Sequence, residues 1–202
     1  MSLTKKATVD FVKMNDKQHQ KLRVCVFCGA SPKVADEFLD LALKTGQLLA
    51  SSTEHVVFGG GAWGMMGSLA DGVTHAGGKV IGVLPRFLFE REPPHPDVSD
   101  IRVVDSMHDR KAIMYDLSDA FMVLPGGFGT MDETMEIITW RQLALHEKPV
   151  TFISHSNFWQ GVRSTFNTMH QEGFLSDRDR NLVSFFESPE LAIQALIDLK
   201  TN

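Results

Sequence analysis

Short apolar runs alternate with longer amphipathic segments along most of the chain, and this alternation restricts the possible folds more than any other feature. The apolar runs are rich in Val, Ile and Phe and lack polar alternation, which is typical of strands buried on both faces of a sheet. The candidate strands are Leu22–Cys28, His55–Phe58, Lys79–Leu84, Ile101–Val104, Ala120–Leu124 and Pro149–Ile153, with a weaker one at Leu182–Phe185. The segments with helical spacing are Val34–Ala50, Met65–Ala76, Met107–Leu117, Met131–His146, Phe158–Gln171 and Pro189–Lys200. This order predicts an α/β fold, a Rossmann-like doubly wound parallel sheet with helices on both faces.

The chain has 202 residues, which is the length of one large domain. We expect residues 1–20 to form a flexible N-terminal arm and residues 21–202 to form a single domain. The stretch Pro85–Asp100 contains four prolines and is expected to be a loop over one edge of the sheet. The first twenty residues lack the apolar stretch of a signal peptide, and no apolar run reaches the roughly 18 residues of a membrane span.

The net charge limits the classes of binding partner, and the cysteine content bears on the redox compartment. The formal net charge of −5 disfavours a nucleic-acid polymer, because such partners usually need a basic surface. Small phosphorylated ligands remain possible, since backbone dipoles can bind them. Cys25 and Cys28 have CxxC spacing, but residues three apart in a strand point to opposite faces. We therefore expect two core thiols and a reducing, cytoplasmic location, with no metal site.

A first glycine-rich turn, Gly59-Gly60-Gly61, lies between a candidate strand and a candidate helix. Such turns meet at one edge of a parallel sheet, where ligands bind near the point of strand-order reversal. Free N–H groups at the start of the helix favour an anion. Gly59–Gly64 also matches the GxGxxG pattern of dinucleotide sites, but the next strand ends at Val83–Arg86 without the required acid, and no P-loop lysine follows. A tight turn that only packs a helix on the sheet is the alternative.

A second glycine-rich turn, Pro125–Thr130, follows the strand at Ala120–Leu124 and leads into Met131, Asp132 and Glu133. Thr130 is a good helix cap whose hydroxyl could also contact phosphate or ribose. Glu133 stands three residues later, so the pair has two interpretations. It is either a capping box or a carboxylate beside an anion site. Glu136 lies one turn further on, which places two carboxylates on one helix face.

Gly59-Gly60-Gly61, Met107–Lys111 and Pro125–Glu133 together resemble the LOG (Lonely Guy) family, the cytokinin riboside 5′-monophosphate phosphoribohydrolases often labelled lysine decarboxylases. The similarity extends from Arg23 to Leu199. The resemblance implies a homodimer in which residues 21–202 are a nucleotide-binding catalytic domain. It also implies hydrolysis of the N-glycosidic bond of purine nucleoside 5′-monophosphates to free base and ribose 5-phosphate, a role in cytokinin biosynthesis, and no cofactor or metal.

The resemblance assigns the catalytic pair to Arg110 and Glu133. Cleavage of a ribosyl C–N bond passes through an oxocarbenium-like state, which a carboxylate stabilises while it orients or deprotonates water. Arg110 would hold Glu133 and the substrate in register. The residues expected to bind substrate are Gly59, Gly60, Gly61, Glu92, Lys111, Gly126, Gly127, Phe128, Gly129, Thr130, Met131, Asp132, Glu136 and Thr139.

Two other functions compete with this hypothesis. An NAD(P)-dependent oxidoreductase would use Gly59–Gly64, but the missing acid counts against it. A non-catalytic nucleotide carrier or sensor would use the same turns without needing both Arg110 and Glu133. Lys111 alone is compatible with a Schiff base to pyridoxal phosphate, yet nothing else in the sequence fits that cofactor. We therefore reject decarboxylation.

Overall fold

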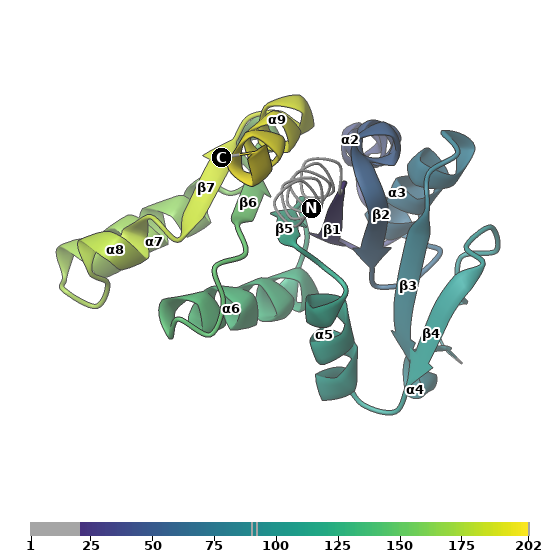
Figure 1. Ribbon diagram of the computed structural model, residues 1–202, viewed down its shortest axis with the longest axis horizontal. Helices are drawn as coiled ribbons and strands as arrows, with labels where there is room; N and C mark the ends of the chain where they lie inside the picture. The colour runs from purple at the N-terminus through teal and green to yellow at the C-terminus, as the bar shows by residue number, and fades with distance from the viewer. Residues whose placement is uncertain (1–20, 90, 92, 202) are drawn as a thin grey trace, which may run out of the picture.

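A single seven-stranded parallel sheet forms the centre of the protein (Figure 1). The computed structural model describes residues 21–89, 91 and 93–201. The strands are β1 (Leu22–Phe27), β2 (Thr53–Phe58), β3 (Val80–Pro85), β4 (Asp100–Val104), β5 (Ala120–Val123), β6 (Val150–Ile153) and β7 (Val183–Phe186). They are arranged in the order β4-β3-β2-β1-β5-β6-β7, and every neighbouring pair is parallel. The predicted fold class is confirmed.

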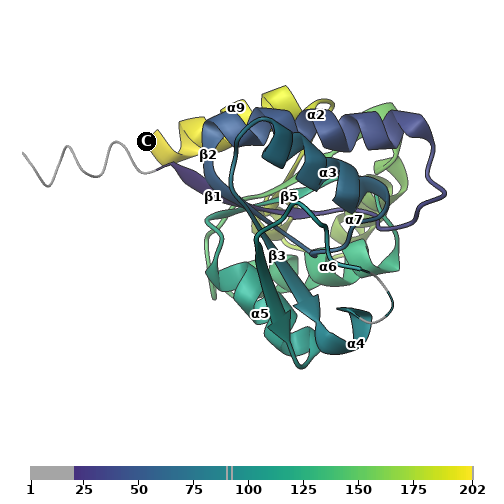
Figure 2. The same ribbon diagram turned by 90° about the vertical axis from the view of Figure 1, so that its right-hand side faces the viewer.

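Helices cover both faces of this sheet (Figure 2). One face packs against α2 (Asp36–Ser52), α3 (Gly64–His75) and α9 (Pro189–Thr201), and the other against α5 (Met107–Asp116), α6 (Phe128–Gln142) and α7 (Gln160–Gln171). Helices α2 and α3 approach closely because a Cβ atom at Gly46 or Gly72 would overlap the backbone of the other helix. The core therefore has two apolar layers, one on each side of the sheet.

The strand β1 shows how the sequence produces these two layers. Cys25 belongs to the apolar cluster under α5 and α6, whereas Cys28 belongs to the cluster under α2 and α3. Both thiols are buried and unpaired, and burial raises the pKa of each of them. The expectation that both are core residues on opposite faces is confirmed.

The chain builds the sheet outward from its centre in two directions. From β1 it moves through β2 and β3 to β4, and then it crosses back to β5 and continues to β7. The order reverses between β1 and β5, so the turns that follow these two strands diverge and leave a crevice at the carboxyl ends. The sequence analysis expected a ligand site at this kind of position.

Three short elements were not predicted: α4 (Arg86–Phe89), the 3₁₀ turn η1 (His155–Asn157) and α8 (Asp177–Arg180). Helix α4 opens the proline-rich stretch that was expected to be a loop. The following segment runs beside the first glycine turn, where Gly61 pairs with Pro94 and the Gly60 carbonyl accepts a hydrogen bond from the His95 amide. The expected arm at residues 1–20 lies outside the described residues. Within the described part of the chain, no helix has the length and apolar character needed to cross a bilayer.

Candidate active site

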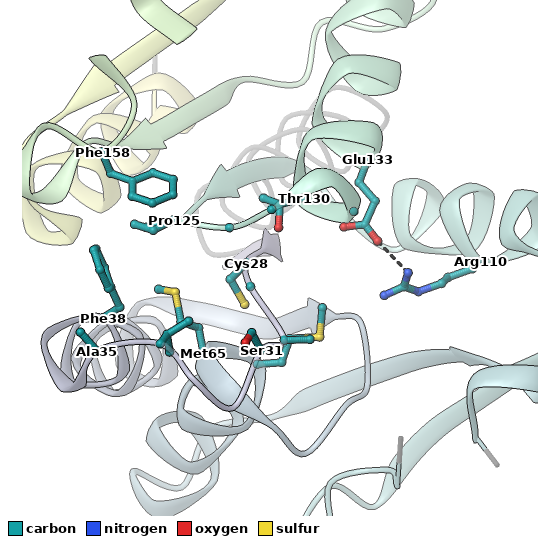
Figure 3. A pocket seen from close by; sticks show the side chains of 17 residues that line it. Cys28, Ser31, Ala35, Phe38, Met65, Arg110, Pro125, Thr130, Glu133 and Phe158 are labelled. Atoms are coloured by element: carbon teal, nitrogen blue, oxygen red, sulfur yellow. Dashed lines mark ion pairs between the residues drawn. The ribbon is translucent and has the colours of Figure 1, made fainter. Parts of the chain in front are cut away.

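A cavity of about 370 Å³ lies at the reversal of strand order, between the segments that follow β1 and β5 (Figure 3). This volume falls within the range of roughly 300 to 1,000 Å³ that is usual for small-molecule sites. Most of its wall is apolar. The lining residues are Cys28, Gly29, Ala30, Ser31, Val34, Ala35, Phe38, Met65, Met66, Arg110, Pro125, Gly126, Gly127, Gly129, Thr130, Glu133 and Phe158.

Arg110 and Glu133 form a buried ion pair at one end of this cavity, with 2.8 Å between Nη1 and Oε1 (Figure 3). Arg110 is 6% exposed and Glu133 is 3% exposed. Arg110 lies on α5, whose first turn is capped because the Ser106 hydroxyl accepts a hydrogen bond from the Asp109 amide. Its guanidinium also donates to the Val83 carbonyl at 3.0 Å and to the Gly59 carbonyl at 3.4 Å. Three acceptors from separate elements thus fix its orientation.

Burial sets the electrostatic state of this pair. Removal from water raises the pKa of Glu133 above its ordinary value, and the adjacent Arg110 guanidinium opposes that change. A carboxylate of this kind binds a proton more readily than an exposed one. Groups with shifted pKa values beside a cavity are typical of active sites.

The second glycine turn forms the start of helix α6 at the cavity wall. The N-cap is Gly127 and the helix begins at Phe128, so Thr130 lies within the first turn and is not the cap. The Glu133 carboxylate pairs with Arg110, and the capping-box interpretation is wrong. Gly126 allows this tight entry, because a Cβ atom there would overlap the Thr130 side chain. The first N–H groups of the helix, near Gly127, Gly129 and Thr130, have no acceptor within the helix, and the dipole favours an anion there.

The first glycine turn has a different position. Gly59, Gly60 and Gly61 do not belong to the cavity lining. The turn contacts Arg110 through the Gly59 carbonyl, which accepts a hydrogen bond from the guanidinium. A Cβ atom on Gly59 would overlap Arg110 Nη2, and Gly60 has a φ of +84°, which favours glycine. The structure thus gives this turn a supporting role under the arginine. Direct contact of these three glycines with substrate stays a prediction.

Three other predicted substrate residues meet between two helices, with Lys111 on α5 and Asp132 and Glu136 on α6. Lys111 donates to Glu136 at 2.6 Å and to Asp132 at 3.3 Å, and these three do not line the cavity. Although burial opposes its charged form, the hydrogen bonds to the two carboxylates raise the pKa of Lys111. A lysine held as an ammonium ion is a poor Schiff-base nucleophile, which supports the rejection of decarboxylation.

The remaining predicted substrate residues lie on α6 or outside the described residues. Phe128, Met131 and Thr139 lie along the outer groove of α6, and Phe128 is 97% exposed. Glu92 lies outside the described residues.

Sequence reasoning missed two aromatic residues of the cavity, Phe38 and Phe158. Phe158 was predicted only as the start of a helical segment, whereas in the structure it is 42% exposed and lines the cavity. The two rings meet edge to face, with 5.7 Å between their centroids, at the end opposite Glu133 (Figure 3). Glu37 ties this end together by accepting hydrogen bonds from Ser156 and His155. The available signal was position, because Phe158 closely follows the carboxyl end of β6.

One cluster away from the cavity could in principle hold a cation. Asp71 and His75 on α3 and Asp97 have ligand atoms within 4.8 Å of one another. Asp71 already accepts a hydrogen bond from the buried His95 at 3.1 Å. Exposed groups of this kind often come together without an ion, and we assign none to them.

The doubly wound sheet, the cavity at its switch point and the helix N-terminus in the wall define an α/β protein with a site for a small ligand. Comparison with known proteins identifies its family. A family described as possible lysine decarboxylase matches residues 66–196. Cytokinin riboside 5′-monophosphate phosphoribohydrolase LOG1 of Arabidopsis thaliana is 38% identical and covers 87% of this chain and 83% of its own length. The chain belongs to the LOG family.

Further comparisons agree with this assignment. The probable cytokinin riboside 5′-monophosphate phosphoribohydrolase LOGL9 of Oryza sativa subsp. japonica is 40% identical over 88% of this chain and 80% of its own length. Among solved structures, the molybdenum cofactor carrier protein of Chlamydomonas reinhardtii aligns with a TM-score of 0.71 and 21% identity, covering 91% of this chain and 100% of its own. At that identity the likeness shows the fold alone.

Proposed function

We infer that this protein hydrolyses the N-glycosidic bond of adenine-type nucleoside 5′-monophosphates to free base and ribose 5-phosphate. Relatives at 38% and 40% identity are named for that reaction on cytokinin riboside 5′-monophosphates. The observation that carries the proposal is the buried Arg110–Glu133 pair beside a cavity that also contains a helix N-terminus. A cytoplasmic location and a role in cytokinin formation are parts of the same proposal.

The phosphate and the sugar of the substrate need different groups in the site. The phosphate monoester needs donors, and the first turn of α6 at Gly127, Gly129 and Thr130 supplies N–H groups and a favourable dipole. The sugar then lies beside Glu133, where the cavity is lined by both members of the ion pair. Binding energy from the phosphate holds the reacting carbon in place, although the phosphate itself does not react.

The chemical step is a displacement at the anomeric carbon. As the bond from C1′ to the base nitrogen breaks, its electron pair leaves with the base and positive charge develops on the sugar. Glu133 stabilises that charge and accepts a proton from water, whose oxygen bonds to C1′. The departing base takes up a proton from solvent and Glu133 returns its proton to solvent, so that one water is consumed and the products are the neutral base and ribose 5-phosphate. Arg110 keeps the carboxylate oriented through its fork of donors.

The experiment that tests the function is a substrate panel followed by chromatography of the released base. Adenosine 5′-monophosphate and an N6-substituted derivative are each compared with the free nucleoside. We expect base release only from the monophosphates, because the free nucleoside cannot use the anion site on α6. Equal turnover of nucleoside and nucleotide would contradict the proposed role of that helix. Binding of the nucleotide without release of base would favour the carrier alternative.

We further propose that the protein is a homodimer that uses the outer face of α6. Phe128, Leu143 and Leu145 are 97%, 64% and 65% exposed. Phe128 lines a groove along α6 together with Met131, Met135 and Trp140. Exposed apolar side chains in one region are typical of a protein–protein contact. No nucleic-acid partner is proposed, because the chain carries a net charge of −5.

A further inference from the structure

A second set of ion pairs joins helices α5 and α6 directly beside the Arg110–Glu133 pair. Lys111 follows Arg110 on α5, and Asp132 and Glu136 flank Glu133 on α6. The Lys111 ammonium contacts Glu136 Oε2 at 2.6 Å and Asp132 Oδ2 at 3.3 Å. The Lys111 side chain is 10% exposed and does not belong to the cavity lining. Its charge is therefore used within the protein, against two carboxylates next to the catalytic one.

The titratable groups around Glu133 come from three elements. Helix α5 supplies Arg110 and Lys111, α6 supplies Asp132, and the β1 segment supplies the thiols Cys25 and Cys28. Burial raises the pKa of both thiols, so they are neutral and contribute no charge at ordinary pH. Arg110 and Lys111 favour the ionised form of Glu133, whereas Asp132 disfavours it. Lys111 opposes Asp132 in this balance, and its ammonium is held in place by its contacts with Asp132 and Glu136.

We propose that Lys111 is a positioning residue whose single positive charge, held between Asp132 and Glu136, partly offsets these two carboxylates and so helps to keep the buried Glu133 ionised against Arg110. This inference rests on the proposed function, because it concerns the carboxylate that acts on the sugar. It differs from the role implied by family resemblance, in which Lys111 itself contacts the substrate. The two roles predict different measurements, because a phosphate ligand affects binding whereas a neutralising charge affects ionisation.

The test compares Lys111→Met, which keeps the length and removes the charge, with Lys111→Arg, which keeps the charge. For Lys111→Met we expect the acidic limb of kcat/KM to move upward by about one pH unit. The inhibition constant of ribose 5-phosphate should stay within about twofold of wild type, as expected for a group that does not touch the product. Lys111→Arg should restore the wild-type limb. Lys79→Met, on the exposed Lys79, controls for the loss of one positive charge elsewhere.

Removing a negative charge should move the limb the other way. In Asp132→Asn we expect the acidic limb to fall below that of wild type, because this carboxylate disfavours ionisation of Glu133. Opposite shifts in the two variants identify electrostatic control and cannot come from general damage to the fold. If Lys111→Met weakens ribose 5-phosphate binding while the limb stays in place, Lys111 is a substrate contact and the proposal is wrong.

A measurement without turnover separates this proposal from the proposed activity. Carbon-13 NMR of the glutamate side-chain carboxyl groups, with Glu133→Gln used for assignment, follows the ionisation of Glu133 directly. We expect its titration to move upward in Lys111→Met and to return in Lys111→Arg. An unmoved titration overturns the role of Lys111 even if the enzyme is active. A moved titration supports that role even if the wild-type protein releases no base.

Discussion

At the scale of single residues, Glu133 combines features that rarely occur together. It is buried, it is paired with a guanidinium held by two backbone carbonyls, and it lines an open cavity. A purely structural ion pair has no need to line a cavity. Because breaking a buried pair strands the other charge, removing Glu133 by truncation would damage the fold as well as the chemistry.

Glu133→Gln keeps the size and one carbonyl oxygen for Arg110 but cannot accept a proton from water. We expect base release from adenosine 5′-monophosphate to fall by about 10²- to 10⁴-fold, the usual contribution of a general base. Binding of ribose 5-phosphate, measured by calorimetry, should persist because the anion site is on another part of α6. If turnover stays within about threefold of wild type in a folded variant, Glu133 is not the base.

The pH profile tests the same residue without mutation. Because burial raises the pKa of Glu133, the ionised form is lost at a higher pH than for an ordinary glutamate, near 4.3. We expect kcat/KM to decline as pH falls through that raised value. The effect on stability has the opposite sign, since the unfolded carboxyl ionises more easily. Protonation of Glu133 contributes fully to the free energy of unfolding below about pH 4.3, and this contribution is lost as pH rises through the pKa of Glu133 in the folded protein. An acidic limb at or below the ordinary value would contradict this account.

At the scale of elements, the first glycine turn affects the site through Arg110. Gly59→Ala should displace the guanidinium, because the new Cβ atom would overlap Nη2 and the Met66 side chain. We expect kcat to fall about tenfold or more, consistent with misorientation of a catalytic group. Gly161→Ala is the matched control, since nothing lies within 4 Å of its Cβ position on α7. Equal rates in the two variants would mean that the turn does not support Arg110.

The elements also show how far sequence reasoning reaches. Period and composition placed all seven strands and the six long helices, because apolar residues recur in them at the spacing of a strand or a helix. Short elements such as α4 and α8 were missed, since four-residue helices make too few hydrogen bonds to leave a pattern. Helix α6 begins at Phe128, earlier than predicted, because its cap is a backbone conformation of Gly127 and not a side chain.

The Arg110–Glu133 pair was predictable, but its surroundings were not. Family resemblance named Arg110 and Glu133, which the structure brings to 2.8 Å. Neither period nor spacing could show that Lys111 forms ion pairs with Asp132 and Glu136. These contacts join two helices, and the paired residues are 21 and 25 positions apart in the sequence. Phe158 was not predicted as a cavity residue for a similar reason. Its exposure depends on the turn after β6 and not on its apolar neighbours in the chain.

At the scale of the whole molecule, the outer face of α6 is a surface with large exposed apolar side chains. Helices α6 and α7 lie on the same side of the sheet (Figure 1). Leu143 and Leu145 follow the end of α6 at Gln142. These two leucines are 64% and 65% exposed, and burying each would contribute roughly 1.5 to 3 kcal/mol. Helix α6 also carries Glu133 on its other side, so a partner on this face would brace the catalytic helix.

This arrangement predicts that the protein sediments at twice its chain mass of 22.5 kDa. The double variant Leu143→Glu with Leu145→Glu should sediment as a monomer, because two buried carboxylates without partners oppose association. Leu199→Glu, at an equally exposed leucine on α9, should remain a dimer. If the wild-type protein is monomeric at micromolar concentration, or if both variants dissociate alike, α6 is not the contact. If the double variant is monomeric yet fully active, dimerisation is separate from catalysis and α6 positions Glu133 unaided.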